Sequence, residues 1–208
     1  MVIQDLKPSK HIPGRWLVML EDGSILRVGE NEVLDYALYR GKELTPEEGE
    51  ALAASTRRSG LKEKAMGLLS RKPVSRRELE RKLAEWEASE EESGEICDRL
   101  EELGFLDDRR YAAQVVAHYA AKSYGPRKLR DELYRRGVPR ELWEEAMEGR
   151  SDNAEAIDAF LEKKLKGSTD PKDLKKASDA LARRGYGWSE IREGLNRLGA
   201  EIQPEDSF

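Results

Sequence analysis

Cysteine is almost absent from this sequence, and no long hydrophobic run occurs. Cys97 stands alone, so an internal disulfide is excluded, which is typical of proteins in a reducing cytosol. No segment approaches the roughly 20 consecutive apolar residues that a membrane-spanning helix needs, and the sequence begins without a signal-peptide pattern. We therefore expect a soluble, cytoplasmic protein with no membrane partner.

Aromatic residues are also few, at 7% of the 208 residues, and the hydrophobic fraction is only 38%. Charged residues make up another 38% of the chain. This balance favours small helical units with thin cores and solvated faces over one thick sheet core. The formal net charge of −5 weighs against a protein whose whole surface coats nucleic acid, although basic residues can still cluster locally.

The segment 103–139 carries the start and stop signals of two consecutive helices. Asp107 is a favourable N-cap for the first helix, and Pro126 opens the second at a position where its missing N–H costs nothing. Gly137 ends the second helix. The spacing of apolar residues predicts one buried face on each helix: Ala112, Val115, Val116 and Tyr119 on the first, and Leu129 and Leu133 on the second.

Residues 1–60 have a different character from the rest of the chain. Two short runs of alternating apolar residues flank Asp22-Gly23, a pairing that predicts a β-hairpin. A short helix is expected from Glu32. Thr45 and Glu48 then form a capping box that begins a second helix, which we expect to stop at Ser59-Gly60.

From Leu61 onward the sequence predicts helices only, and they repeat. The apolar and basic positions of 75–83 recur 50 residues later, in 125–133, and those of 133–137 recur 48 residues later, in 181–185. Each copy contains three predicted helices: 62–72, 75–86 and 90–103; then 108–123, 126–136 and 139–148; then 152–166, 171–184 and 188–198. A unit of this size buries little surface alone, so we expect the copies to stack.

The predicted fold is therefore mainly α, with three tandem three-helix repeats in an elongated, curved array and a small N-terminal hairpin plus helices. The expected domains are 1–60 (hairpin and short helices), 61–106, 107–149 and 150–199 (the repeats) and 200–208 (a flexible tail). An acidic insertion, 87–95, separates the second and third helices of the first repeat.

No constellation of residues supports catalysis. Asp107 and Asp108 are adjacent at a helix start, where a cap and a helix-dipole partner explain them better than a metal site. His11 and His118 are far apart, and Cys97 lies among apolar residues as a small core side chain. We therefore predict a protein that is not an enzyme and that uses no cofactor or metal.

Positive charge on the middle helix of each repeat is the remaining signal. It is either a solvated face balanced by glutamates four residues away, as with Glu78 and Lys82, or a shared binding surface. Its recurrence in three copies favours the binding surface, with Tyr124, Tyr134 and Trp188 as candidate anchors. The predicted partner-binding residues are Arg76, Arg77, Arg81, Lys82, Lys122, Arg127, Lys128, Arg130, Arg135, Arg136, Lys175, Lys176, Arg183 and Arg184.

The chain resembles the RecX family of bacterial regulators of RecA recombinase. The most specific segments are AMGLLSRKPVSRRELERKL (65–83), LEELGFLDDRRYAAQVV (100–116), YGPRKLRDELYRRGV (124–138) and LARRGYGWSEI (181–191). The resemblance implies helical repeats that bind in the groove of the RecA filament and restrain its ATP hydrolysis and strand exchange. It also implies some affinity for single- or double-stranded DNA, and no chemistry by the protein itself.

The leading hypothesis is thus a monomeric, non-enzymatic modulator of the RecA–DNA filament, with a role in DNA repair, recombination and the SOS response. The alternative is a helix-turn-helix-like protein that binds a duplex site. That alternative requires a recognition helix with side chains aimed at base edges, whereas the candidate helices here are dominated by Arg, Lys and Glu.

Overall fold

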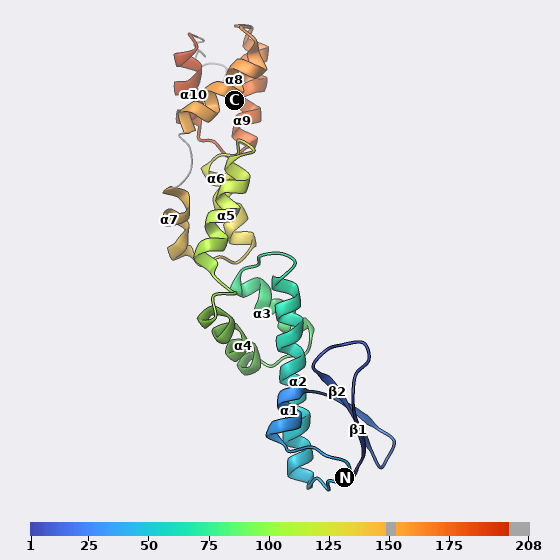
Figure 1. Ribbon diagram of the computed structural model, residues 1–208. Helices are drawn as coiled ribbons and strands as arrows, with labels where there is room; N and C mark the ends of the chain where they lie inside the picture. Colours follow the sequence, from blue (N-terminus) through green and yellow to red (C-terminus); the bar gives the residue numbers. More distant parts are fainter. Residues whose placement is uncertain (149–152, 200–208) are drawn as a thin grey trace. The chain divides into compact units, whose positions relative to one another are not determined.

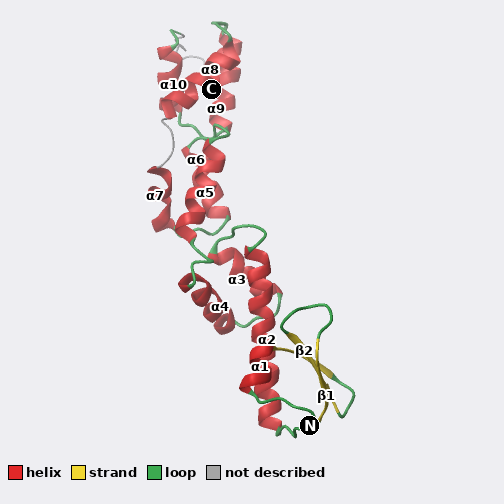
Figure 2. Cartoon of the chain, in the orientation of Figure 1, coloured by secondary structure: helices red, strands yellow, loops and turns green. Residues whose placement is uncertain are grey.

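The computed structural model describes residues 1–148 and 153–199, and helices predominate among them (Figures 1 and 2). The chain divides into two compact units. The first unit combines Met1–Lys72 with Lys82–Ile96, and the second combines Pro73–Arg81 with Cys97–Phe208. The predicted mainly helical fold with a small N-terminal sheet is confirmed. The expected tail, 200–208, and the predicted boundary at 149/150 lie outside the described residues.

A three-stranded antiparallel sheet begins the first unit. Its strands are β1 (Ile3–Pro8), β2 (Arg15–Leu20) and β3 (Ile25–Gly29), in that order across the sheet. The predicted hairpin is β2–β3, with Gly23 at a φ of +80° in its turn. The prediction of a hairpin alone was incomplete, because β1 pairs along the other edge of β2 and contributes the fully buried Ile3 to the core.

Two helices pack with this sheet. The first is α1 (Glu30–Asp35), and the second is α2 (Pro46–Leu69), which begins with the predicted capping box. The predicted stop at Ser59-Gly60 was wrong, because α2 runs through both residues. A glycine inside a helix costs only about 1 kcal/mol, and the Ser59 hydroxyl is held by a hydrogen bond to the buried Glu32 carboxylate. Packing therefore overrides the local stop signal.

Most of the acidic insertion 87–95 is helical. Helix α3 (Arg76–Glu85) is followed closely by α4 (Glu90–Glu102), whose first turn contains the acidic residues. Ser89 caps that turn, and Glu92 forms an ion pair of 2.9 Å with Arg57 of α2. The run of glutamates thus satisfies the positive end of a helix dipole and holds α4 to α2 within the first unit.

The second unit contains the two later groups of helices. One group consists of α5 (Asp108–Ala120), α6 (Pro126–Arg135), the short 3-10 helix η1 (Arg140–Leu142) and α7 (Trp143–Glu148). The other consists of α8 (Asn153–Leu165), α9 (Pro171–Arg183) and α10 (Trp188–Arg197). These bounds agree closely with the predicted helices, except that the predicted start at residue 152 lies outside the described residues.

Each group surrounds its own hydrophobic core. The α5–α7 core includes the predicted faces of both helices, with Ala112, Leu129 and Leu133 fully buried. The α8–α10 core includes the fully buried Leu161, Leu181 and Leu195. The small, separate cores explain how a chain with so little hydrophobic content folds, since each needs only about nine buried residues.

Candidate interaction surface

Two junctions, defined here by their contacts, join successive middle helices within the second unit. At the first junction, the turn after α6 meets the start of α3. The Ser75 hydroxyl donates a hydrogen bond to the Arg136 carbonyl, and the Asp108 carboxylate accepts one of 2.8 Å from the backbone N–H of Arg76. Gly137, at a φ of +69°, lies directly against the Arg77 side chain.

The second junction lies at the equivalent place, between the turn after α9 and the start of α6, but its hydrogen bonds join backbone groups. The Gly125 N–H donates to the Arg184 carbonyl at 2.8 Å, and the Arg127 N–H donates to the Gly185 carbonyl at 3.1 Å. Gly185, at a φ of +92°, lies so close that an added Cβ would come within 2.5 Å of the backbone nitrogen of Lys128. The repeated Arg-Arg-Gly motif is therefore a docking motif between repeats.

The two arginines that precede these glycines are engaged within the fold rather than available to a partner. Arg184 donates to the Lys122 carbonyl at 3.1 Å, and its guanidinium lies 4.7 Å from the centre of the Phe160 ring. Arg136 lies over the Tyr119 ring and donates to its hydroxyl at 3.1 Å. Both side chains stabilise contacts that the fold itself requires.

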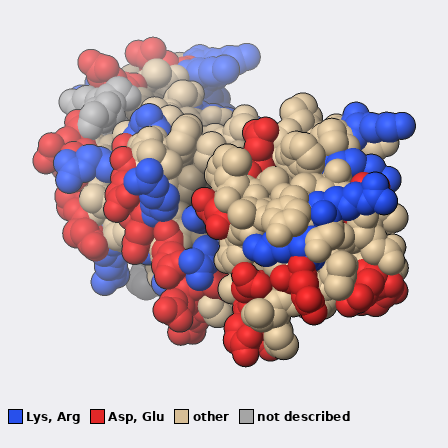
Figure 3. All heavy atoms as spheres, turned by 60° about the horizontal axis from the view of Figure 1, so that its bottom comes forward, with Lys and Arg blue, Asp and Glu red and all other residues tan. Residues whose placement is uncertain are grey.

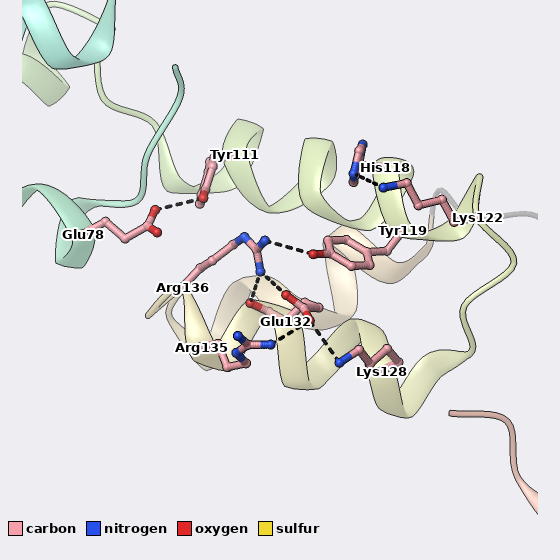
Figure 4. Close-up of polar contacts among 9 residues, drawn as sticks. All are labelled: Glu78, Tyr111, His118, Tyr119, Lys122, Lys128, Glu132, Arg135 and Arg136. Atoms are coloured by element: carbon pink, nitrogen blue, oxygen red, sulfur yellow. Dashed lines mark hydrogen bonds and ion pairs between the residues drawn. The ribbon is translucent and has the colours of Figure 1, made fainter. Parts of the chain in front are cut away.

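Glu132 is the centre of a charged cluster on α6 (Figure 4). Its carboxylate is almost fully buried and accepts hydrogen bonds from Lys128 at 3.1 Å, from Arg135 at 3.2 Å and from Arg136. Burial by itself would raise the pKa of Glu132, but the hydrogen bonds from Arg136, Lys128 and Tyr119 outweigh it and lower the pKa to about 2. The carboxylate is therefore ionised at neutral pH and holds three cations at once.

Further acidic residues hold other predicted basic side chains. The nitrogen–oxygen distances of these ion pairs range from 2.5 to 3.7 Å. The pairs are Arg76 with Glu80, Asp98 and Glu101; Lys82 with Glu85; Arg130 with Glu144; and Lys176 with Asp173. In addition, the Lys122 ammonium lies 2.8 Å from the His118 ring nitrogen. On the face drawn in Figure 3, basic and acidic side chains likewise alternate.

Five predicted residues differ from these paired ones. Within the part of the chain that the structure describes, no carboxylate forms an ion pair with Arg77, Arg81, Arg127, Lys175 or Arg183, and all five side chains are exposed. Of these, Arg77 and Arg81 line a groove. The expected common surface of three equivalent basic helices is therefore interrupted by ion pairs, and two of its unpaired residues, Arg77 and Arg81, lie together at the first junction.

A groove of about 680 Å³ opens at that junction, and we call it the first-junction groove. Its basic lining residues are Arg76, Arg77, Arg81, Arg135 and Arg140, and Tyr134, which is 73% exposed, lines it as well. The structure thus brings Arg76, Arg77, Arg81 and Arg135 together. The other predicted site residues, Lys82, Lys122, Arg127, Lys128, Arg130, Arg136, Lys175, Lys176, Arg183 and Arg184, do not line this groove.

The sequence prediction missed Arg140, because it lies on the third helical segment of its repeat rather than on the middle helix. Its guanidinium lies 5.6 Å from the centre of the Trp143 ring, close to the groove. The signal that could have found it is its position after Val138-Pro139, where the chain turns back beside the start of α3. Among the candidate anchors, Tyr134 lines the groove, whereas Tyr124 is half-buried under Arg184.

The two acidic groups that line the groove are already engaged. Glu80 accepts from Arg76 at 2.9 Å, and Asp108 accepts from the Arg76 backbone. Burial raises the pKa of Asp108 above its ordinary value, and the Arg76 N–H opposes that change only in part. Both carboxylates therefore offer little to a ligand, and the groove presents mainly guanidinium groups.

Few side chains among the described residues are placed to bind a metal ion or to act as a nucleophile. Among them, no group of three or more His, Cys, Asp and Glu side chains is placed to hold a metal ion. Burial raises the pKa of the Cys97 thiol to about 12, so it stays protonated at neutral pH. No helix in the described ranges is long and apolar enough to cross a membrane.

The fold and the groove define a class: a helical-repeat protein of three-helix units with basic side chains gathered at one junction. Family models for the first and second three-helix domains of RecX match residues 62–100 and 107–147. The chain is also 36% identical over 133 residues to the regulatory protein RecX of Xanthomonas axonopodis pv. citri (strain 306), across 62% of this chain and 82% of that protein. The chain belongs to the RecX family.

Other comparisons agree with this assignment. The regulatory protein RecX of Stenotrophomonas maltophilia (strain R551-3) is 36% identical, with the same coverage of both chains. A crystal structure of a regulatory protein RecX matches the fold with a TM-score of 0.73 at 21% identity, over 96% of this chain and 99% of that one. The crystal structure of RecX from Lactobacillus salivarius matches with a TM-score of 0.64 at 22% identity, over 69% and 97% of the two chains.

Proposed function

We propose that this protein binds the filament that RecA recombinase forms on DNA and restrains RecA activities, including ATP hydrolysis and strand exchange. Membership of the RecX family carries the proposal, since the relatives are named regulatory proteins. The protein performs no chemistry of its own and acts as a cytoplasmic monomer in DNA repair, recombination and the SOS response. Its repeats, 61–106, 107–149 and 150–199, follow the groove of the filament.

The first-junction groove supports this proposal as the principal contact with the filament. Arginine and tyrosine are the residue types that dominate the energetics of protein interfaces, and the groove combines Arg77, Arg81, Arg135 and Arg140 with the exposed Tyr134. The remaining predicted basic residues contribute long-range attraction or hold the repeats together. DNA within the filament is a further source of contacts for exposed residues such as Lys175 and Arg183.

The alternative, a helix-turn-helix-like protein that reads duplex DNA, is less well supported. A recognition helix needs side chains that extend to base edges. On α6, however, Lys128, Arg135 and Arg136 are gathered around Glu132, and Arg130 pairs with Glu144. A protein that binds one duplex sequence far more tightly than others would favour this alternative.

Measurement of RecA-driven ATP hydrolysis on single-stranded DNA tests the proposed function. We expect addition of this protein to lower the steady-state hydrolysis rate and to slow strand exchange. A matched amount of heat-denatured protein serves as the control. If neither rate changes at protein concentrations that saturate the filament, the modulator function is contradicted.

A further inference from the structure

The first-junction groove has two walls of the same charge. Arg77 and Arg81 lie four residues apart on α3, so they project from one side of that helix on successive turns. Arg135 and Arg140 come from the end of α6 and from η1. Because Glu80 and Asp108 are occupied by Arg76, the groove has more guanidinium groups than its own carboxylates can neutralise.

The floor of the groove is apolar. Val138, Pro139 and Trp143 line it, and the indole N–H of Trp143 is already donated to the Val138 carbonyl at 2.9 Å. Tyr134 adds an exposed aromatic ring. A ligand that fits must therefore combine negative charge for the walls with an apolar side chain for the floor.

These features favour a protein segment over a nucleic-acid strand. A volume of about 680 Å³ suits a few side chains, and it is too small for a duplex. The net charge of −5 repels a long polyanion at a distance but affects a short peptide much less. Glu80 and Asp108 also interrupt the positive lining that a continuous phosphate backbone would follow.

We propose that the first-junction groove docks a short acidic peptide segment of a partner protein, with carboxylates on Arg77, Arg81 and Arg140 and one apolar side chain on the Val138–Trp143 floor. Bidentate pairing between guanidinium and carboxylate supplies orientation as well as affinity. The inference deepens the proposed function, because the filament is then the source of the segment. Its test, however, requires no filament.

Fluorescence anisotropy with the full chain tests the inference. The probes are a fluorescein-labelled peptide of Asp and Glu around one Leu, the same peptide with Asn and Gln, and labelled oligo-dT. The groove variants are Arg81→Glu and Arg140→Glu, one from each wall. Arg192→Glu, at an exposed α10 position outside the groove, is the matched control.

We expect the acidic peptide to bind the parent and the control alike, and each groove variant to weaken binding about tenfold or more, as expected for loss of a charged hydrogen bond. The Asn and Gln peptide should not bind. Equal weakening by Arg192→Glu, or no binding of the acidic peptide, would overturn the inference. Tighter binding of oligo-dT that the groove variants abolish would overturn it in favour of a nucleic-acid site. If the acidic peptide does not bind but the protein still inhibits RecA, the proposed function stands and only the inference about the groove is overturned. If the peptide binds as expected but RecA is not inhibited, only the proposed function is contradicted.

Discussion

The first and second junctions place a glycine in the same way but differ in their hydrogen bonds and in the side chains around them. At both, a glycine at positive φ follows an engaged arginine and lies against the start of the preceding middle helix. The positions equivalent to Arg77, Arg81, Arg135 and Arg140 are Arg127, Asp131, Arg183 and Trp188. The repeats therefore share the Arg-Arg-Gly turn that joins them and differ in the residues that would meet a partner, which is how repeat proteins separate stability from recognition.

The largest expected effect comes from the core of the α5–α7 group, which takes part in both junctions. Leu133→Ala removes a fully buried side chain and should lower the free energy of unfolding by roughly 2–5 kcal/mol. Leu181→Ala should cost a similar amount in the α8–α10 core, which takes part in the second junction only. Chemical denaturation measures the loss, and limited proteolysis locates it. Cleavage confined to the α8–α10 group in both variants would contradict the expectation that loss of the α5–α7 core disturbs both junctions.

The junction glycines should differ in their tolerance of alanine. Both have positive φ, which costs a side chain about 1–3 kcal/mol. At Gly137 the new Cβ would meet the Arg77 side chain, of which the outer atoms can rotate away and only the Cβ is fixed, whereas at Gly185 it would come closest to the backbone nitrogen of Lys128, which cannot move. Gly185→Ala should therefore lower the melting temperature more than Gly137→Ala. An equal shift would mean that backbone conformation alone explains both glycines.

Glu132 should make the stability of the protein depend on acid pH. Its pKa of about 2 lies below the ordinary 4.5, so its contribution is fully present above pH 4.5 and is lost as the pH falls toward 2. Glu132→Gln should cost on the order of 1–3 kcal/mol at neutral pH and flatten the pH dependence in that window. Denaturation midpoints measured across the window for both proteins check this, and parallel curves would contradict it.

The smallest effects should come from the exposed arginines. Arg127→Glu should change the free energy of unfolding by no more than about 0.5 kcal/mol, because Arg127 has no ion-pair partner among the described residues. Lys128→Glu, one position further, should cost more, since it places a second carboxylate beside the buried Glu132. Urea denaturation of the two variants compares them. Equal stability would show that the Glu132 cluster is not required for folding.

The helices and their caps could be predicted from the sequence because they depend on local signals. Asp107 accepts from the Arg110 N–H as expected of an N-cap, and Pro126 opens α6. The sequence could not show that α2 continues through Ser59-Gly60, since that depends on the tertiary contact between Ser59 and Glu32. Which basic residues are paired could not be predicted either. Glu132 is one acidic residue among many in the sequence, and only the fold buries it next to three cations.

Inhibition of RecA ATP hydrolysis by two matched double variants tests the central claim that recognition is concentrated at the first junction. One variant combines Arg81→Glu with Arg140→Glu, and the other combines Arg127→Glu with Arg183→Glu, at exposed positions near the second junction. We predict that the first variant loses most of its inhibition while remaining folded, and that the second inhibits nearly as well as the parent. Equal loss in both, or loss in the second alone, would contradict the claim.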